Sequence, residues 1–497
     1  MHSTVDKVII AAMSNDKNYE TLDPEDWDEM RMLGHQMVDD AVEYLKTVGD
    51  RPVWQAVPQA VKETFNSGLP QQPDDASAVY EEFLTNIFPY PMGNIHPRFW
   101  SWYMGNGTIM GAFADFMAAT MNPNMSGGNH VAGLVEAQVL NWMKEVVGLP
   151  TSASGLLLSG GSMANLVGLT IARNTLAGGD LRKNGLQSLD KKLTVYASTE
   201  VHSCNQKAVE LLGLGSDCLR KIEVNDDYTI NLKKLKSRID KDIQSGFQPI
   251  CIIATPGTVN TGAIDDLNAI ADLCREYDIW FHVDGAIGAI AMLSDTVRPL
   301  LTGIERADSI ALDLHKWMHV PFEAGCVLVR DEKAHRDSFS LIPEYLEKAE
   351  GGLVADSVWF SEYGIQLSRS FRALKIWMMM KQHGSKKLGR MISRNVDQAQ
   401  YLGRLIEKTE HLELIAPIGL DIVCYRYNPG ETDLQALNQL NRKILIELQE
   451  QGIAAPSYTT LKDRYCIRVA IANHRSRYED FDLLVEQTIR IAQSISA

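Results

Sequence analysis

The sequence lacks the cysteine pattern of a disulfide-bonded or zinc-binding protein. Its seven cysteines are an odd number, and they are scattered between Cys204 and Cys466 without close pairs. Disulfide frameworks and zinc sites need cysteines at short, regular spacings, so we expect neither here. This usage is typical of a reducing compartment, and a cytoplasmic protein is expected.

The chain also has no long apolar run and no excess of basic residues. It contains no uncharged run of about 18 or more apolar residues, and residues 1–15 show no cleavage-site pattern, so no membrane span or export signal is expected. Lys and Arg total 48 against 63 Asp and Glu, a net charge of −15. That charge disfavours nucleic acid and anionic membranes as partners. A small-molecule ligand fits better.

What the sequence does contain is enough material for a large folded protein. With 497 residues, 45% of them hydrophobic, two or three segments sharing a large core are expected. Apolar residues at helical spacing from Trp27 to Val48 predict an N-terminal helical segment. Between Gly155 and Arg330, short apolar runs alternate with helical stretches, which is typical of a parallel sheet buried on both faces. We predict boundaries that give segments 1–105, 106–380 and 381–497, with a large α/β domain in the middle and an α+β domain at the end.

A glycine-rich turn follows one of these apolar runs. Ser159-Gly160-Gly161-Ser162 opens a helix-compatible stretch that ends near Arg173. Glycine lets the backbone approach an anion, and a helix N-terminus supplies free N–H groups and positive potential, so a phosphate could bind there. An ordinary strand-to-helix turn is the alternative, and the motif alone favours it.

Another apolar run, Trp280 to Asp284, ends in a carboxylate and is followed by Gly285 and Ala286. In open α/β sheets, ligands bind beyond the carboxyl ends of the strands. An aspartate at that place can keep a pyridine nitrogen protonated, while small neighbours let a flat ring lie close. A helix N-cap is the alternative role for Asp284.

A lysine and a histidine complete the pattern. The run from Asp308 ends in His315-Lys316, and a lysine desolvated at a strand end has a lowered pKa that favours reaction with an aldehyde. Most lysines are solvated surface groups, which is the alternative. His202 follows the run Leu193 to Ala197 and offers a flat ring that can stack on a cofactor, although a single histidine is more often structural.

Taken together, the series resembles the group II pyridoxal-phosphate decarboxylases, which include aromatic amino acid, tryptophan, histidine and glutamate decarboxylases. The resemblance runs from about Asp23 to the C-terminus, and His282-Val283-Asp284 followed by His315-Lys316-Trp317 is a highly specific pair of motifs. It implies pyridoxal 5'-phosphate as cofactor and fold type I, the transferase-like α/β fold with a mainly parallel sheet. It also implies a homodimer with shared active sites.

The resemblance gives each candidate a role. Lys316 matches the lysine that binds the cofactor aldehyde, Asp284 the partner of the pyridine nitrogen, and His202 the ring that stacks on the cofactor. Other residues match cofactor-binding positions of the family: Gly161, Ser162, Thr258, Ala286 and His315. The family's commonest pattern has consecutive threonines after the glycine of residues 254–260, and Val259 interrupts that pattern here.

Two further segments concern the substrate and the product. Tyr345 matches the mobile-loop tyrosine that protonates the carbon left by carbon dioxide, and relatives with phenylalanine there tend to form aldehydes. An ordinary surface tyrosine is the alternative. Trp102 and Tyr103 match the substrate pocket and suit a flat aromatic side chain, although aromatic core packing explains either ring equally well.

The sequence therefore predicts a carboxy-lyase that converts an L-amino acid, preferably aromatic, into its amine and carbon dioxide. An aldehyde-forming oxidative enzyme and a histidine or glutamate decarboxylase stay open as alternatives. A rival class is a metal hydrolase, because His282, Asp284, His315 and His319 are metal-ligand types. It leaves the glycine turn and Lys316 unexplained, so no metal is expected. A catalytically silent relative is disfavoured by the intact set of candidates.

Overall fold

The structure is a computed structural model that describes residues 21–341, 352–354, 358–431 and 433–496. The chain separates into two compact units. One unit comprises residues 1–47 and 58–89, and the other comprises residues 48–57 and 90–497.

The first unit is helical in the part that the structure describes. It contains α2 (Trp27–Lys46), α3 (Gln59–Thr64) and α4 (Ala76–Asn86), and the carboxylates of Asp26 and Asp75 cap the N-termini of α2 and α4. The Tyr80 hydroxyl on α4 donates to Asp40 on α2 at 2.8 Å. The predicted N-terminal helical segment is confirmed.

A seven-stranded sheet forms the centre of the second unit, with strand order β2-β8-β7-β6-β5-β3-β4. The β3–β4, β3–β5, β5–β6 and β6–β7 pairs are parallel, and β8 runs antiparallel to both of its neighbours. The strands are β2 (Ser154–Leu158), β3 (Leu193–Ser198), β4 (Leu219–Ile222), β5 (Gln248–Ala254), β6 (Trp280–Asp284), β7 (Ser309–Asp313) and β8 (Gly325–Val329).

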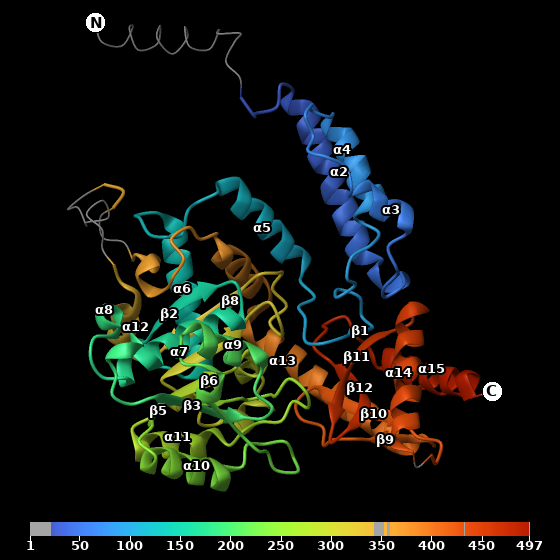
Figure 1. The fold of residues 1–497 in the computed structure, drawn as a ribbon. Helices are drawn as coiled ribbons and strands as arrows, with labels where there is room; N and C mark the ends of the chain where they lie inside the picture. Colours follow the sequence, from blue (N-terminus) through green and yellow to red (C-terminus); the bar gives the residue numbers. More distant parts are fainter. Residues whose placement is uncertain (1–20, 342–351, 355–357, 432, 497) are drawn as a thin grey trace, which may run out of the picture. The chain divides into compact units, whose positions relative to one another are not determined.

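Helices cover this sheet, which is why its strands read as continuous apolar runs (Figure 1). The helices of this part of the chain are α5 (Ile109–Met121), α6 (Val131–Val147), α7 (Gly161–Leu176), α8 (Leu181–Asn184), α9 (Ser203–Leu211), α10 (Leu232–Gln244), α11 (Leu267–Tyr277) and α12 (Glu332–Phe339). The predicted α/β fold with a mainly parallel sheet is confirmed. None of the described helices has an apolar stretch long enough to cross a membrane.

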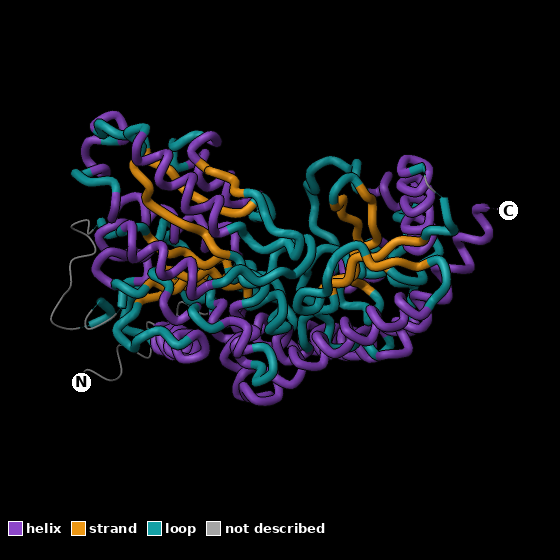
Figure 2. The backbone as a smooth tube through the Cα atoms, turned by 90° about the horizontal axis from the view of Figure 1, so that it is seen from below, coloured by secondary structure: helices purple, strands orange, loops and turns teal. Residues whose placement is uncertain are grey.

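A five-stranded sheet of order β1-β11-β12-β10-β9 forms a separate group of strands (Figure 2). Its strands are β1 (Phe99–Trp100), β9 (Leu412–Leu414), β10 (Ile422–Tyr427), β11 (Ala455–Leu461) and β12 (Arg464–Ala470). Its helices are α14 (Leu434–Glu450) and α15 (Tyr478–Ser496). Because β1 pairs in parallel with β11, the aromatic strip around Phe99 becomes an edge of the C-terminal sheet.

The long helix α13 (Arg372–Lys408) connects the two sheets and is interrupted at Gly384, whose φ is 71°. Glycine reaches this left-handed conformation without the cost that a side chain would bring. The break lies four residues beyond the predicted boundary at 380, and the three-segment division of the chain stays a prediction.

Candidate active site

One cavity gathers most of the predicted site residues. It has a volume of about 570 Å³, within the usual range for small-molecule sites, and lies beyond the carboxyl ends of the central strands. Nine predicted residues line it: Trp102, Tyr103, Gly161, Ser162, His202, Asp284, Ala286, His315 and Lys316. The residues predicted at strand ends, Gly161, His202, Asp284 and Lys316, lie up to 155 positions apart and line one cavity.

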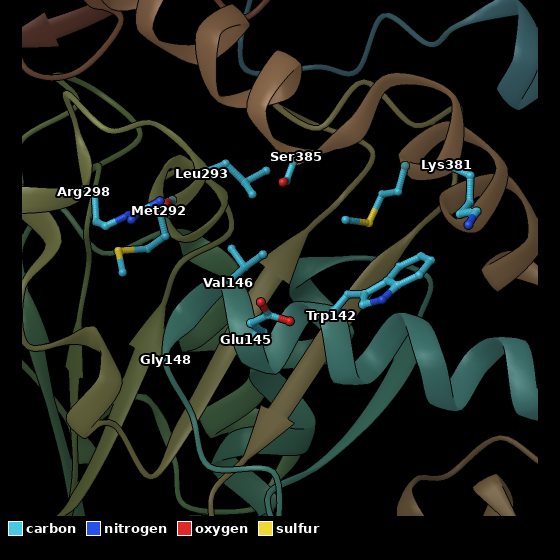
Figure 3. A pocket seen from close by; sticks show the side chains of 10 residues that line it. Trp142, Glu145, Val146, Gly148, Met292, Leu293, Arg298, Lys381 and Ser385 are labelled. Atoms are coloured by element: carbon cyan, nitrogen blue, oxygen red, sulfur yellow. The ribbon is translucent and has the colours of Figure 1, made fainter.

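A second hollow, about 510 Å³ in volume, lies among α6, residues 289–293 and α13 (Figure 3). Trp142, Glu145 and Lys381 are among the side chains that line it. None of the predicted site residues is among its lining residues, so the first cavity is the candidate active site.

Lys316 lies just beyond the end of β7 and forms an ion pair within the cavity. Its Nζ lies 2.8 Å from Oδ2 of Asp313, and its side chain keeps 21% of its exposure. The second oxygen of Asp313 is buried without a hydrogen-bond partner among the described residues. Asp313 was not predicted from the sequence, although it ends β7 just as Asp284 ends β6, which is the signal that predicted Asp284.

Asp284 is almost fully buried at the end of β6 and is held by an amide. Asn205 on α9 donates its Nδ2–H to Oδ2 of Asp284 at 2.7 Å. Asn205 was not singled out from the sequence, because no local pattern links α9 to β6. Asn205 thereby orients the Asp284 carboxylate, and Asp284 lines the cavity.

The neighbouring His282 supports this wall from within the core. Its Nδ1 lies 2.7 Å from the Ser309 hydroxyl and its Nε2 lies 2.8 Å from Oδ1 of Asn165. Burial lowers the pKa of His282 to about 4, so the ring is neutral at pH 7 and donates from Nε2 to the amide oxygen. Both ring nitrogens are engaged, which leaves His282 in a structural role.

His202 caps α9 and faces the cavity. Its Nδ1 accepts from the backbone N–H of Cys204 at 3.2 Å. Burial lowers the pKa of His202, so the imidazole is neutral at pH 7 and carries its proton on Nε2. A neutral, flat ring at this place suits stacking against an aromatic cofactor.

The glycine turn forms the start of α7. A Cβ on Gly161 would lie 2.8 Å from Oδ2 of Asp313 and 3.1 Å from Cβ of Ala286, so this close approach requires glycine. Within the described residues, the backbone N–H groups of Gly161 and Ser162 have no hydrogen-bond partner. These N–H groups and the positive helix end provide the donors that a phosphate needs.

Thr258 and Tyr345 are the predicted residues not found in this lining. Thr258 is fully buried, its hydroxyl contacts that of Thr261 at 3.0 Å, and it is not among the residues that line the cavity. Thr255, from the same loop, does line it. The cofactor contact of Thr258 stays a prediction. Tyr345 lies outside the described residues, and its role also stays a prediction.

The aromatic strip forms another wall of the cavity. Trp102 is 57% exposed and adopts a positive φ of 53°, while Tyr103 is buried against Trp317, with ring centroids 6.0 Å apart at 81°. His315 packs against Phe322 with ring centroids 4.4 Å apart and the ring planes tilted by 36°. The cavity thus has a polar side with Lys316 and Asp284 and an aromatic side.

Comparison with known proteins agrees with this geometry. The family model described as the pyridoxal-dependent decarboxylase conserved domain matches residues 58–428. The chain belongs to the pyridoxal-dependent decarboxylase family. The predicted family, lyase class and pyridoxal phosphate cofactor are confirmed, and the alternative of a metal hydrolase is set aside.

Individual relatives cover almost the whole chain. An aromatic-L-amino-acid decarboxylase of Bacillus atrophaeus is 33% identical over 94% of this chain and 96% of its own. A phenylacetaldehyde synthase of Arabidopsis thaliana is 28% identical over 90% of this chain and 93% of its own. The crystal structure of an Oryza sativa TDC with PLP and tryptamine superimposes with a TM-score of 0.87 at 25% identity, covering 96% and 100% of the two chains. The protein is a pyridoxal-phosphate-dependent amino acid decarboxylase.

Proposed function

We propose that this decarboxylase acts on an aromatic L-amino acid and releases the corresponding amine and carbon dioxide. The observation that carries the proposal is the cavity itself, which combines Lys316, Asp284 and His202 with the aromatic wall of Trp102 and Tyr103. The relatives that act on aromatic amino acids support the same substrate class.

The polar side of the cavity fits pyridoxal phosphate. Lys316 would hold the aldehyde carbon, and Asp284 would face the pyridine nitrogen. The unpartnered N–H groups of Gly161 and Ser162 would hold the phosphate. Ala286 leaves room beneath the ring, and His202 would stack above it.

Pyridoxal phosphate, when bound, supplies the electron sink that accepts the electron pair of the bond to the departing carboxylate. The protein's own residues orient the cofactor and the lysine amine. The Asp284 carboxylate, fixed by Asn205, would hold a proton on the pyridine nitrogen by charge attraction. Asp313 would hold the Lys316 amine in place for the reaction. Tyr345 would deliver the proton that completes the amine.

The substrate side of the cavity favours a flat apolar side chain. Trp102, Tyr103, Met104 and Phe322 offer rings and a thioether, and aromatic pairs add about 0.5–1.5 kcal/mol beyond the burial of area. Glu323 at this side is engaged by Arg372 at 2.7 Å, which reduces its effect on an incoming ring. An acidic or basic substrate side chain lacks a matching free partner among these lining residues.

An aldehyde-forming reaction is the second candidate function, because one relative is named a phenylacetaldehyde synthase. The tyrosine at position 345 favours simple decarboxylation, since resemblance associates phenylalanine there with aldehyde formation. Product analysis separates the two, because aldehyde formation releases ammonia in place of the amine.

We also propose a cytoplasmic homodimer with shared active sites. All seven cysteines are free and buried, as suits a reducing compartment. Large apolar side chains are exposed on α5 and α6, with Phe116 at 66% and Leu134 at 72%, and such a patch is typical of a protein interface. Sedimentation of the purified protein should give twice the mass of the chain.

The central test measures colour and product together. Purified protein with pyridoxal phosphate should show a visible absorbance band and release carbon dioxide from phenylalanine, tyrosine or tryptophan, and Lys316→Ala should abolish both. Histidine and glutamate serve as comparison substrates. Carbon dioxide release from glutamate or histidine alone would overturn the aromatic assignment, while aldehyde and ammonia as main products would favour the second candidate.

A further inference from the structure

The hydroxyl of Tyr103 is bound by a carboxylate that does not line the cavity. It donates to Oδ2 of Asp421 at 2.7 Å, and Asp421 lies directly before β10 with no solvent exposure. The cavity lining includes Tyr103 but not Asp421. The Tyr103 hydroxyl therefore donates its hydrogen bond to a residue outside the cavity lining, and it is not free to bind a substrate in the cavity.

A second residue of the C-terminal sheet holds the neighbouring backbone. Nη1 of Arg468 on β12 donates to the carbonyl of Trp102 at 2.7 Å, and its Nε donates to the carbonyl of Asn260 at 3.2 Å. Trp102 has a left-handed φ of 53°, which costs a bulky residue free energy and persists only where surrounding contacts hold it. Arg468 supplies such a contact.

Burial of the Asp421 carboxyl group at this position costs desolvation free energy. Its Oδ1 is buried without a hydrogen-bond partner among the described residues. Burial raises the pKa of Asp421 to about 7, against the opposing effects of Tyr103 and Arg468. An apolar side chain would avoid this desolvation cost, so packing does not explain the carboxylate.

We propose that Asp421 is a specificity-determining positioning residue: by binding the hydroxyl of Tyr103, it fixes the ring as an apolar surface of the substrate wall. The proposal rests on the proposed function, because it takes Trp102 and Tyr103 as the substrate wall. Asp421 acts through Tyr103 and does not touch the substrate.

Three variants of the pair test this role. Asp421→Leu and Tyr103→Phe each remove the hydrogen bond, and Asp421→Asn keeps an acceptor for the Tyr103 hydroxyl. For phenylalanine and tryptophan, the first two should raise KM roughly three- to tenfold, the value of a typical net hydrogen bond, and change kcat less. Asp421→Asn should restore most of the wild-type KM. The double variant Tyr103→Phe/Asp421→Leu should be no worse than either single variant.

Tyr425→Phe is the matched control. It removes another buried tyrosine hydroxyl of the C-terminal sheet, one that contacts Thr488 at 3.0 Å and lies away from the cavity. It should lower thermal stability without raising KM. An equal rise in KM for Tyr425→Phe would overturn the proposal, because a general loss of stability would then explain the effect.

A second measurement does not depend on activity. Thermal unfolding of the cofactor-free protein should show that the stability losses of Tyr103→Phe and Asp421→Leu are not additive, because the two variants break the same hydrogen bond. Additive losses, or an unchanged KM in both variants, would overturn the role of Asp421. If the wild-type protein releases no carbon dioxide from any amino acid, the proposed function is wrong. The unfolding measurements would then still test whether Tyr103 and Asp421 depend on each other.

Discussion

The ammonium group of Lys316 lies 2.8 Å from the carboxylate of Asp313, three positions earlier in the chain. A carboxylate at this distance forms a charge-assisted hydrogen bond with the lysine nitrogen. It restrains a long side chain that would otherwise sample many rotamers. Asp313 therefore fixes the position of the Lys316 amine.

Asp313→Asn should lower kcat more than it changes KM. The amide keeps the shape of the carboxylate but removes its charge, so the charge-assisted bond that holds the Lys316 amine is weakened. We expect a loss of kcat of about tenfold, equivalent to about 1.4 kcal/mol. Steady-state kinetics with an aromatic amino acid measure it, and an unchanged kcat would show that the ion pair does not position Lys316.

Gly161→Ala should weaken the binding of pyridoxal phosphate. The added Cβ would lie 2.8 Å from Asp313 Oδ2 and would displace the turn that lines the cavity. Gly133→Ala on α6 is the matched control, because a Cβ there meets no atom within 4 Å. Titration of the cofactor-free variants should show at least about a tenfold weaker Kd for Gly161→Ala, a loss of about 1.4 kcal/mol. Equal affinities for the two variants would contradict the assignment.

The sequence alone predicted the central sheet and the strand ends because these signals are local. Asp284 and Lys316 follow buried apolar runs, and the carboxyl ends of parallel strands meet at one edge. The glycine turn before α7 is equally local. The family resemblance then supplied the roles that position alone left open.

The supporting contacts were harder to predict because they join distant segments. Asn205 reaches Asp284 across 79 positions, and Tyr103 reaches Asp421 across 318. No periodicity or motif encodes such pairs, since they depend on how whole elements pack. Thr255 lines the cavity and Thr258, from the same loop, is not among the lining residues, so the cofactor contact of Thr258 stays a prediction.

Tyr345→Phe should shift the products from amine toward aldehyde and ammonia. The phenolic proton donor is lost, while the ring and its volume are kept, so protonation slows and oxidation by dissolved oxygen can compete. The measurement is the ratio of amine to aldehyde, with oxygen consumption followed in parallel. Tyr458→Phe, at a 58% exposed tyrosine of β11, is the control and should leave the ratio unchanged. An unaltered ratio in Tyr345→Phe would remove this tyrosine from the protonation step.

Asp421→Asn should gain stability relative to the wild type as the pH rises from 5 to about 7. The pKa of Asp421 rises from 3.8 to about 7 on folding, so the folded state binds more protons than the unfolded state between these values. Wild-type stability therefore falls as the pH rises from 3.8 to about 7, because the carboxyl group ionises in the unfolded state while burial keeps it protonated in the folded state. Asparagine cannot ionise, and it still accepts the Tyr103 hydroxyl. Thermal unfolding of cofactor-free protein from pH 5 to pH 8 should show the two melting curves separating as the pH increases. Parallel pH dependences would mean that Asp421 is already ionised at pH 5. Contacts other than the Tyr103 hydroxyl would then stabilise the buried carboxylate.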